Sequence, residues 1–233
     1  MLRTVAAYGV HAYTASGVLL AALSTAAILD GQLRVSLALL AVAVFVDATD
    51  GALARLARVH RYAPRIDGAR LDDIVDYLTY VAVPIFIAWW VAALPAGWAW
   101  VPVGAVLLSS ACGFARTDAK TADHFFTGFP SYWNLVILYG LAWRWTPEVF
   151  GLVLVGFAVA VFVPIRYVYP SRTPAFQTLT LVLTSLWGVQ MAAMIWWIAA
   201  VPAWLLWSTV VYPLYYLGLS LYLHGRAPSE RPA

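Results

Sequence analysis

Long apolar stretches separated by short polar segments dominate the pattern of this sequence. Each stretch has about 17 to 25 residues, the length that an α-helix needs to cross the hydrocarbon core of a bilayer while satisfying its own backbone groups. The pattern predicts eight such helices, at roughly Ala12–Leu29, Val35–Ala57, Ala69–Leu94, Trp98–Arg116, Phe129–Trp145, Val149–Val168, Phe176–Ile198 and Ala203–His224. We therefore expect an all-α, polytopic membrane protein with about eight transmembrane helices.

The first apolar stretch follows Arg3 and ends in small residues, as a secretory signal does. It also carries polar side chains, among them His11 and Thr14, which are unusual in a signal segment. We interpret it as a retained helix. Residues 1–233 are then expected to form one integral membrane domain.

The composition excludes a soluble domain, because 63% of the residues are hydrophobic and only 11% are charged. The net charge of +3 comes from basic residues that lie between apolar segments, so we expect no nucleic-acid partner. The single cysteine, Cys112, cannot form a disulfide within one chain. We expect it to pack in the core.

The lysines and arginines are divided unevenly between the two sides of the predicted membrane domain. Of these 14 residues, 12 lie on the side that holds both termini and the longer loops, and only Arg34 and Arg144 lie on the other. Because positive residues favour the cytoplasmic side, this side is predicted to face the cytoplasm.

Aspartates are concentrated in one part of the chain. Asp47 and Asp50 lie inside the second apolar stretch, where each carboxylate costs about 2.5 to 3.5 kcal/mol to insert. Residues three and four apart share a helix face, so Asp47 pairs with Asp50, and Asp72 pairs with Asp76 on the next helix. The two helices are joined by a short loop, and we expect all four carboxylates to meet near the cytoplasmic face.

Four clustered carboxylates repel one another and need protons or cations to balance their charge. Oxygen ligands of this kind suit Mg²⁺ or Mn²⁺, which usually keep positions open for water or substrate phosphate. The sequence therefore predicts a metal site made of Asp47, Asp50, Asp72 and Asp76.

Small residues and one arginine surround these carboxylates. Gly51, Ala54 and Gly68 leave room for a ligand, and Arg55 offers a planar cation to phosphate. Asp67 is interpreted as the N-cap of the following helix. Asp73 lies about a hundred degrees around that helix from Asp72 and is left out of the metal site.

The order of these residues resembles the signature of the CDP-alcohol phosphotransferases. It runs Asp47-x2-Asp50-Gly51-x2-Ala54-Arg55-x12-Gly68-x3-Asp72-x3-Asp76. The gap of 12 residues between Arg55 and Gly68 is longer than is usual in that family. A gap of this length resembles that of one branch, the bacterial phosphatidylcholine synthases. Three further segments resemble the same branch: His11–Gly17, Asp76–Tyr80 and His124–Asn134.

The resemblance implies transfer of the phosphatidyl group from CDP-diacylglycerol to choline, giving phosphatidylcholine and CMP, with Mn²⁺ or Mg²⁺ required. It also implies a six-helix core extended here by two helices, a bacterial inner membrane location and often a homodimer. Asp47, Asp50, Asp72 and Asp76 would hold metal. The CDP-diacylglycerol site would be lined by Asp50, Gly51, Ala54, Arg55 and Gly68.

Asp76 is the predicted general base for the incoming hydroxyl, because it lies one turn deeper in the membrane than Asp72. Choline carries a quaternary ammonium with no hydrogen to donate, so aromatic faces are expected to bind it. The candidates near the carboxylates are Tyr77, Tyr80, Tyr132 and Trp133, with Asn134 and Ser131 available for the choline hydroxyl.

Two alternatives remain. One is a related enzyme whose acceptor is glycerol phosphate, inositol phosphate or serine, with Arg116 and Lys120 as extra cations for a phosphorylated acceptor. The other is an ion-coupled transporter that uses the intramembrane carboxylates. The absence of a convincing internal repeat in the sequence favours the enzyme.

Overall fold

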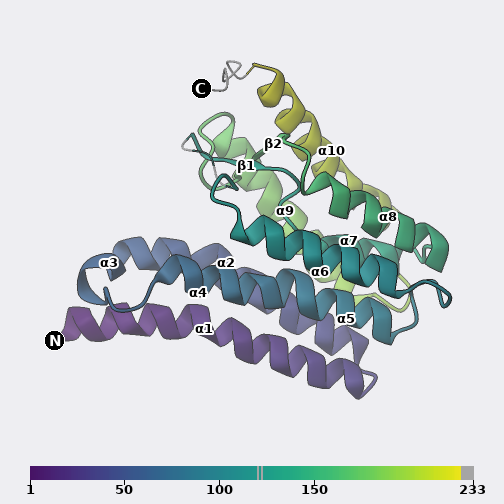
Figure 1. Ribbon diagram of the computed structural model, residues 1–233, viewed down its shortest axis with the longest axis horizontal. Helices are drawn as coiled ribbons and strands as arrows, with labels where there is room; N and C mark the ends of the chain where they lie inside the picture. Colours follow the sequence, from purple (N-terminus) through teal and green to yellow (C-terminus); the bar gives the residue numbers. More distant parts are fainter. Residues whose placement is uncertain (120, 122, 227–233) are drawn as a thin grey trace.

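The computed structural model describes residues 1–119, 121 and 123–226, and helices make up nearly all of its regular structure (Figure 1). In this part of the chain the elements are α1 Leu2–Leu29, α2 Leu33–Leu56, α3 Val59–Tyr62, α4 Gly68–Asp76, the π-helix η1 Tyr77–Ala82, α5 Val83–Trp90, α6 Trp100–Ala115, β1 Phe125–Thr127, α7 Trp133–Ala142, α8 Pro147–Ala160, β2 Arg166–Val168, α9 Gln177–Trp196 and α10 Ala203–Arg226. The prediction of an all-α membrane fold is confirmed.

Each of the eight predicted stretches coincides with a helical segment, and the third is the continuous run of α4, η1 and α5. By length and composition, α1, α2 and α9 can each cross a bilayer, whereas α6, α7 and α8 are shorter apolar helices. The number of membrane crossings stays a prediction.

The predicted sixth helix, Val149–Val168, is too long. Helix α8 ends at Ala160, and Arg166–Val168 forms β2, which pairs with β1 in an antiparallel two-stranded sheet. Pro164 accounts for the difference, because it cannot donate a backbone hydrogen bond and disfavours helical backbone at the residue before it.

Two helix starts also differ from the prediction. Helix α7 begins at Trp133 rather than at Phe129, because Pro130 and the positive φ of 56° at Ser131 are incompatible with helix. Helix α1 begins at Leu2 rather than at Ala12, so its first three turns extend beyond the apolar stretch.

Cys112 was expected in the core, and this expectation is wrong. Its side chain is exposed on α6, whereas Ser109 and Ser110 of the same helix are buried. Because successive residues advance by about 100° around a helix, Cys112 lies on the face opposite Ser110.

Helices α1 and α2 form a tight antiparallel pair, and α2 carries Asp47 and Asp50. The turn between them uses Gly31, whose φ of 74° lies in the left-handed region. The buried hydroxyl of Ser24 donates to the carbonyl oxygen of Ser36, 2.9 Å away. At Gly17 a side chain would overlap Val75, so the glycine allows α1 to lie close against α4.

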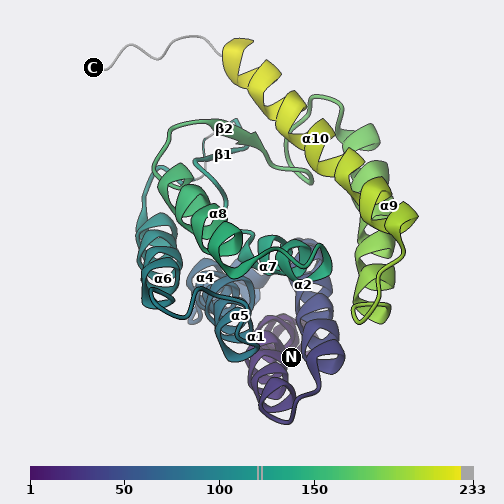
Figure 2. The ribbon, with the colours of Figure 1, turned by 90° about the vertical axis from the view of Figure 1, so that its right-hand side faces the viewer.

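The helices fall into two groups when the molecule is turned (Figure 2). Helices α5 to α8 and the π-helix surround a core that includes Trp133, Phe150 and Leu154, and a second core joins α1, α2, α5 and α7 to α9 and α10. Helices α9 and α10 lie to one side as a pair, with α9 against α2 and α10 against β2. The division into a six-helix core and two further helices stays a prediction.

A π-helix follows directly after Asp76. Pro84 lacks a backbone N–H, so the carbonyl of Tyr80 loses its partner four residues on, and the turn widens from Tyr77 to Ala82. The hydroxyl of Thr79 donates to the Val75 carbonyl oxygen, 3.0 Å away, across this junction. The wider turn sets the direction in which the side chains after Asp76 point.

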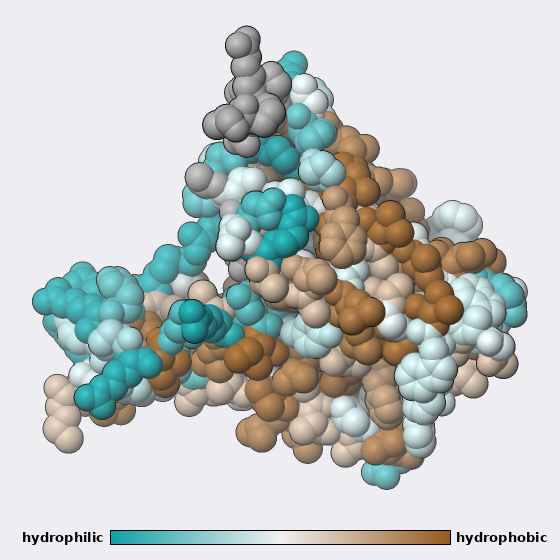
Figure 3. All heavy atoms as spheres, in the orientation of Figure 1, coloured by the Kyte–Doolittle hydropathy of each residue, from teal (hydrophilic) through white to brown (hydrophobic). Residues whose placement is uncertain are grey.

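Hydrophilic side chains gather at the end of the molecule that holds α3, β1 and β2, whereas apolar side chains cover much of the rest of the visible face (Figure 3). This separation is typical of a protein whose apolar part lies in a bilayer.

Candidate active site

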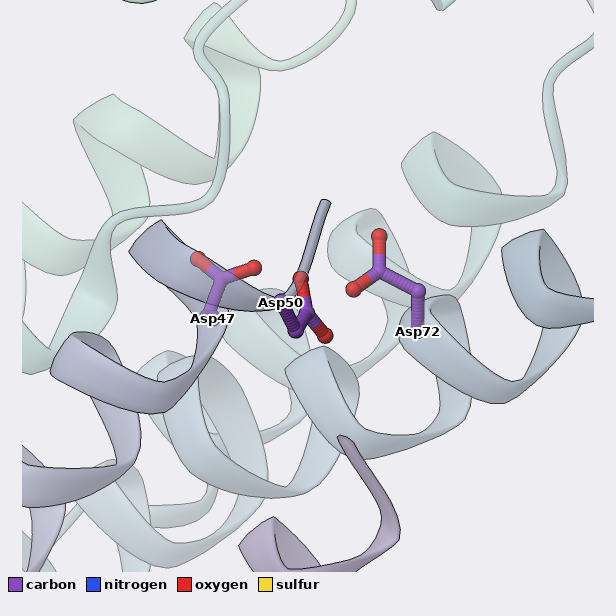
Figure 4. Close-up of side chains that lie close together, drawn as sticks. All are labelled: Asp47, Asp50 and Asp72. Carbon is purple, nitrogen blue, oxygen red and sulfur yellow. The ribbon is translucent and has the colours of Figure 1, made fainter. Parts of the chain in front are cut away.

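Three aspartates from two neighbouring helices point toward one another (Figure 4). Asp47 and Asp50 lie three residues apart on one face of α2, and Asp72 extends from α4. One carboxylate oxygen from each lies within 4.8 Å of the others, a geometry that can hold a metal ion. The structure therefore brings together three of the four predicted metal ligands in one group.

Hydroxyl groups from other helices hold two of these carboxylates in place. The Thr14 hydroxyl on α1 donates to Asp50 Oδ2 over 2.7 Å, and Asp50 is only 7% exposed. The Tyr80 hydroxyl on η1 donates to Asp47 Oδ2, also over 2.7 Å. Such contacts orient ligands before a metal binds, because the ligating side chains cannot rotate away.

Asp76 lies one turn beyond Asp72, at the end of α4, and is half-buried. It is not part of the three-residue group. Asp76 is the last residue of α4 and directly precedes the π-helix. This position separates Asp76 from the residues that form the triad.

A cavity of about 530 Å³ opens beside the triad, between α1, α2, α4 and the α3 loop. Asp50 and Asp72 form part of its wall, and the remaining predicted nucleotide residues line it too: Gly51, Ala54, Arg55 and Gly68. A volume of this size is typical of small-molecule and cofactor sites. The cavity thus joins the predicted nucleotide site to the carboxylates.

The two signature glycines have different surroundings. A Cβ at Gly51 would meet only the Arg55 guanidinium, at 3.6 Å, so this glycine leaves one side of the cavity open. A Cβ at Gly68 would lie 3.3 Å from the His11 ring, which is tighter than ordinary contact. Gly68 therefore makes room for a buried side chain of α1, in addition to the clearance expected for a ligand.

No family model matches the chain, but curated proteins do. It is 44% identical to a phosphatidylcholine synthase of Legionella pneumophila over 168 residues, which are 72% of this chain and 66% of that protein. It is 35% identical to a phosphatidylcholine synthase of Pseudomonas aeruginosa over 81% of this chain and 79% of that protein. For the phosphatidylcholine synthase of Borreliella burgdorferi the identity is 33%, over 78% of each.

The chain belongs to the phosphatidylcholine synthase family. The matched segment spans just under two thirds of the Legionella pneumophila synthase and 62% of the Legionella bozemanae synthase. Family membership agrees with the long gap between Arg55 and Gly68 in the carboxylate signature.

The aromatic residues predicted for the acceptor have different positions in this synthase family member. Trp133 is fully buried, and its indole N–H donates to the Ser110 hydroxyl over 2.6 Å. The Tyr77 hydroxyl donates to the carbonyl oxygen of Leu107 on α6, 3.0 Å away. Both side chains therefore serve packing between α6 and its neighbours.

Tyr132 lies beside Tyr80, the predicted ring whose hydroxyl contacts a carboxylate directly. Its ring centroid is 6.1 Å from that of Tyr80, and its hydroxyl is within electrostatic range of Asp47 and Asp76. Asn134 accepts a hydrogen bond from the backbone N–H of Leu135, 2.8 Å away, at the start of α7. Tyr132 and Tyr80 together form an aromatic wall beside the triad.

Sequence reasoning assigned no role to three polar residues near the site. Thr14 supports Asp50, His11 is 5% exposed and lines the cavity, and Arg172 lines the cavity from the segment before α9. A buried polar residue in an apolar helix is a signal that could have identified Thr14 and His11. The contribution of Arg172 depends on a tertiary contact and has no local signal.

Two further predictions about single aspartates can be checked. Asp67 accepts hydrogen bonds from the backbone N–H groups of Ala69 and Arg70, which confirms it as the N-cap of α4. Asp73 is half-buried and stands outside the three-residue group.

Proposed function

We propose that the chain transfers the phosphatidyl group of CDP-diacylglycerol to choline, giving phosphatidylcholine and CMP. The observation that carries this proposal is the group formed by Asp47, Asp50 and Asp72 at the wall of a nucleotide-sized cavity. The similarity to proteins named phosphatidylcholine synthase supports the choice of donor and acceptor.

Mg²⁺ or Mn²⁺ fits the triad, because all three donors are carboxylate oxygens within 4.8 Å of one another. We propose Asp47, Asp50 and Asp72 as its ligands, with Asp76 as a further ligand. When bound, the metal neutralises charge on the diphosphate and on the departing CMP. Arg55, one turn after Asp50 on α2, adds a guanidinium from the cavity wall.

In the proposed reaction the choline hydroxyl oxygen attacks the phosphorus that carries diacylglycerol. A new oxygen–phosphorus bond forms, the bond from that phosphorus to the CMP oxygen breaks, and the choline proton passes to the Asp76 carboxylate. The described residues that line the cavity include no serine or cysteine, so direct attack is preferred over a covalent enzyme intermediate.

The site is proposed to face the cytoplasm from the bacterial inner membrane. The 12-to-2 division of lysine and arginine supports this orientation. The cavity also opens beside α3 and its loop, at the hydrophilic end of the molecule (Figure 3).

An acceptor panel tests the proposal. Purified protein with CDP-diacylglycerol and Mn²⁺ is offered choline, ethanolamine, serine, inositol phosphate and glycerol phosphate in turn, and CMP release is measured. Choline is expected to give by far the highest kcat/KM. Preference for a phosphorylated acceptor would contradict the proposal and favour the related enzymes, and no CMP release with any acceptor in detergent would favour a transporter.

The alternative with a phosphorylated acceptor would use Arg116 and Lys120 as extra cations, and the contacts of Arg116 give it little support. The Arg116 guanidinium pairs with Asp118, 2.6 Å away, and also donates to the carbonyl oxygen of Val161 at the end of α8. Lys120 lies outside the described residues. Arg116 thus ties the end of α6 to α8.

Tyr132→Ala is expected to raise the KM for choline about twofold to thirtyfold, because a cation-π contact contributes about 0.5 to 2 kcal/mol. The KM for CDP-diacylglycerol should change less, since Tyr132 packs against Tyr80 and is not among the described residues that line the nucleotide cavity. The measurement is choline saturation at fixed lipid substrate.

Tyr132→Phe is the matched control, because it keeps the ring and removes only the hydroxyl. It is expected to keep a choline KM near that of the wild type. Unchanged choline saturation in Tyr132→Ala would remove this ring from the acceptor site.

A further inference from the structure

Arg172 lines the nucleotide cavity although it lies far along the chain from the other described lining residues. Those other residues lie between Val10 and Asp72, whereas Arg172 comes from the segment between β2 and α9. Figure 1 shows this segment at the same end of the molecule as α3. Arg172 thus joins the cavity wall from a different segment than α2, which carries Arg55.

Hydrogen bonds hold the backbone on both sides of Arg172. The N–H groups of Arg172 and Thr173 both donate to the carbonyl oxygen of Tyr169, at 2.9 and 2.8 Å. Thr173 is only 1% exposed, and its hydroxyl donates to the carbonyl oxygen of His124 over 2.6 Å. The Gln177 amide donates to Ser171 over 2.9 Å. The segment is therefore anchored to the loop before β1 and presents the arginine from a fixed backbone.

The charges around the cavity favour a diphosphate between the two arginines. Asp50, Asp67 and Asp72 supply the negative groups, and Arg55 and Arg172 supply the guanidinium groups, with His60 at the edge. No ion pair among the described residues holds either arginine. A metal on the carboxylate side leaves both guanidinium groups available to phosphate oxygens, which they bind in a planar, two-pronged geometry.

We propose that Arg172 is a second phosphate-binding residue for the nucleotide diphosphate, in addition to Arg55 in the wall of the same cavity. The inference rests on the proposed function and names a residue that the carboxylate signature does not contain. The segment between β2 and α9 then links the two C-terminal helices to the nucleotide site.

Binding of CDP to the purified protein in detergent with Mn²⁺, measured by calorimetry, tests the proposal without any acceptor. Arg172→Gln is expected to weaken CDP binding on the order of tenfold or more, as expected for losing a hydrogen bond to a charged group. Arg172→Lys should keep part of the affinity, because the charge remains. In turnover assays the KM for CDP-diacylglycerol should rise and the KM for choline should stay nearly constant.

Arg226→Gln is the matched control, since it removes the same charge from the end of α10 and is expected to bind CDP as the wild type does. Wild-type CDP affinity in Arg172→Gln would overturn the proposal. The proposal would be overturned even if the KM for CDP-diacylglycerol rose, because CDP carries both phosphates of the diphosphate and the arginine would then act on the diacylglycerol part of the substrate. CDP affinity is measured without choline, so a failure of the proposed acceptor chemistry would leave this test intact.

Discussion

Asp50→Asn is expected to lower turnover by at least about a hundredfold, since charge stabilisation at a metal site contributes several kcal/mol. Asp50 is the most buried of the triad and lies at the cavity wall, and Asn removes one of the three negative charges of the group. The measurement is CMP release at saturating choline over a range of Mn²⁺ concentrations. The variant should also require more Mn²⁺ for half-maximal activity.

Asp47→Asn and Asp72→Asn are expected to cause losses of similar size, because the three carboxylates form one site. Their effects should not add: a double variant should be little worse than either single variant. Asp73→Asn is the control on the same helix turn and is expected to be mild. Robust turnover by Asp50→Asn or Asp72→Asn, in protein that elutes from a sizing column as the wild type does, would contradict the metal assignment.

Asp76→Asn is expected to lower kcat by about 10²- to 10⁴-fold, the usual contribution of a positioned general base. The affinity for CDP and Mn²⁺ should fall less than in Asp50→Asn, because Asp76 lies outside the triad. Rapid-mixing measurements of CMP release, combined with CDP titration, separate the two effects.

The assignment of the base depends on this separation. If Asp76→Asn lost CDP and Mn²⁺ affinity as severely as Asp50→Asn, Asp76 would act mainly as a ligand. Near-normal rates at any pH at which the wild type is active would assign proton transfer to another group.

Most of the helical architecture could be predicted from apolar stretches, because each membrane helix satisfies its own backbone and needs only length and hydrophobicity. The exceptions are local. Pro164 stops the continuation of α8, and the positive φ of Ser131 delays α7. The strands β1 and β2 lie 41 positions apart at their first residues, Phe125 and Arg166, and no pattern within either predicts the pairing.

By itself the sequence determined that Asp47 and Asp50 share a face, that Asp67 caps the next helix and that four carboxylates fall on two neighbouring helices. These conclusions follow from helix periodicity, which acts over a few residues. Only the tertiary structure decided which residues of distant segments complete the site. Thr14 reaches Asp50 because α1 packs along α2, and Arg172 reaches the cavity because Thr173 is bound to the loop before β1. Such contacts depend on how whole helices and loops pack, a property that spacing within any one segment does not contain.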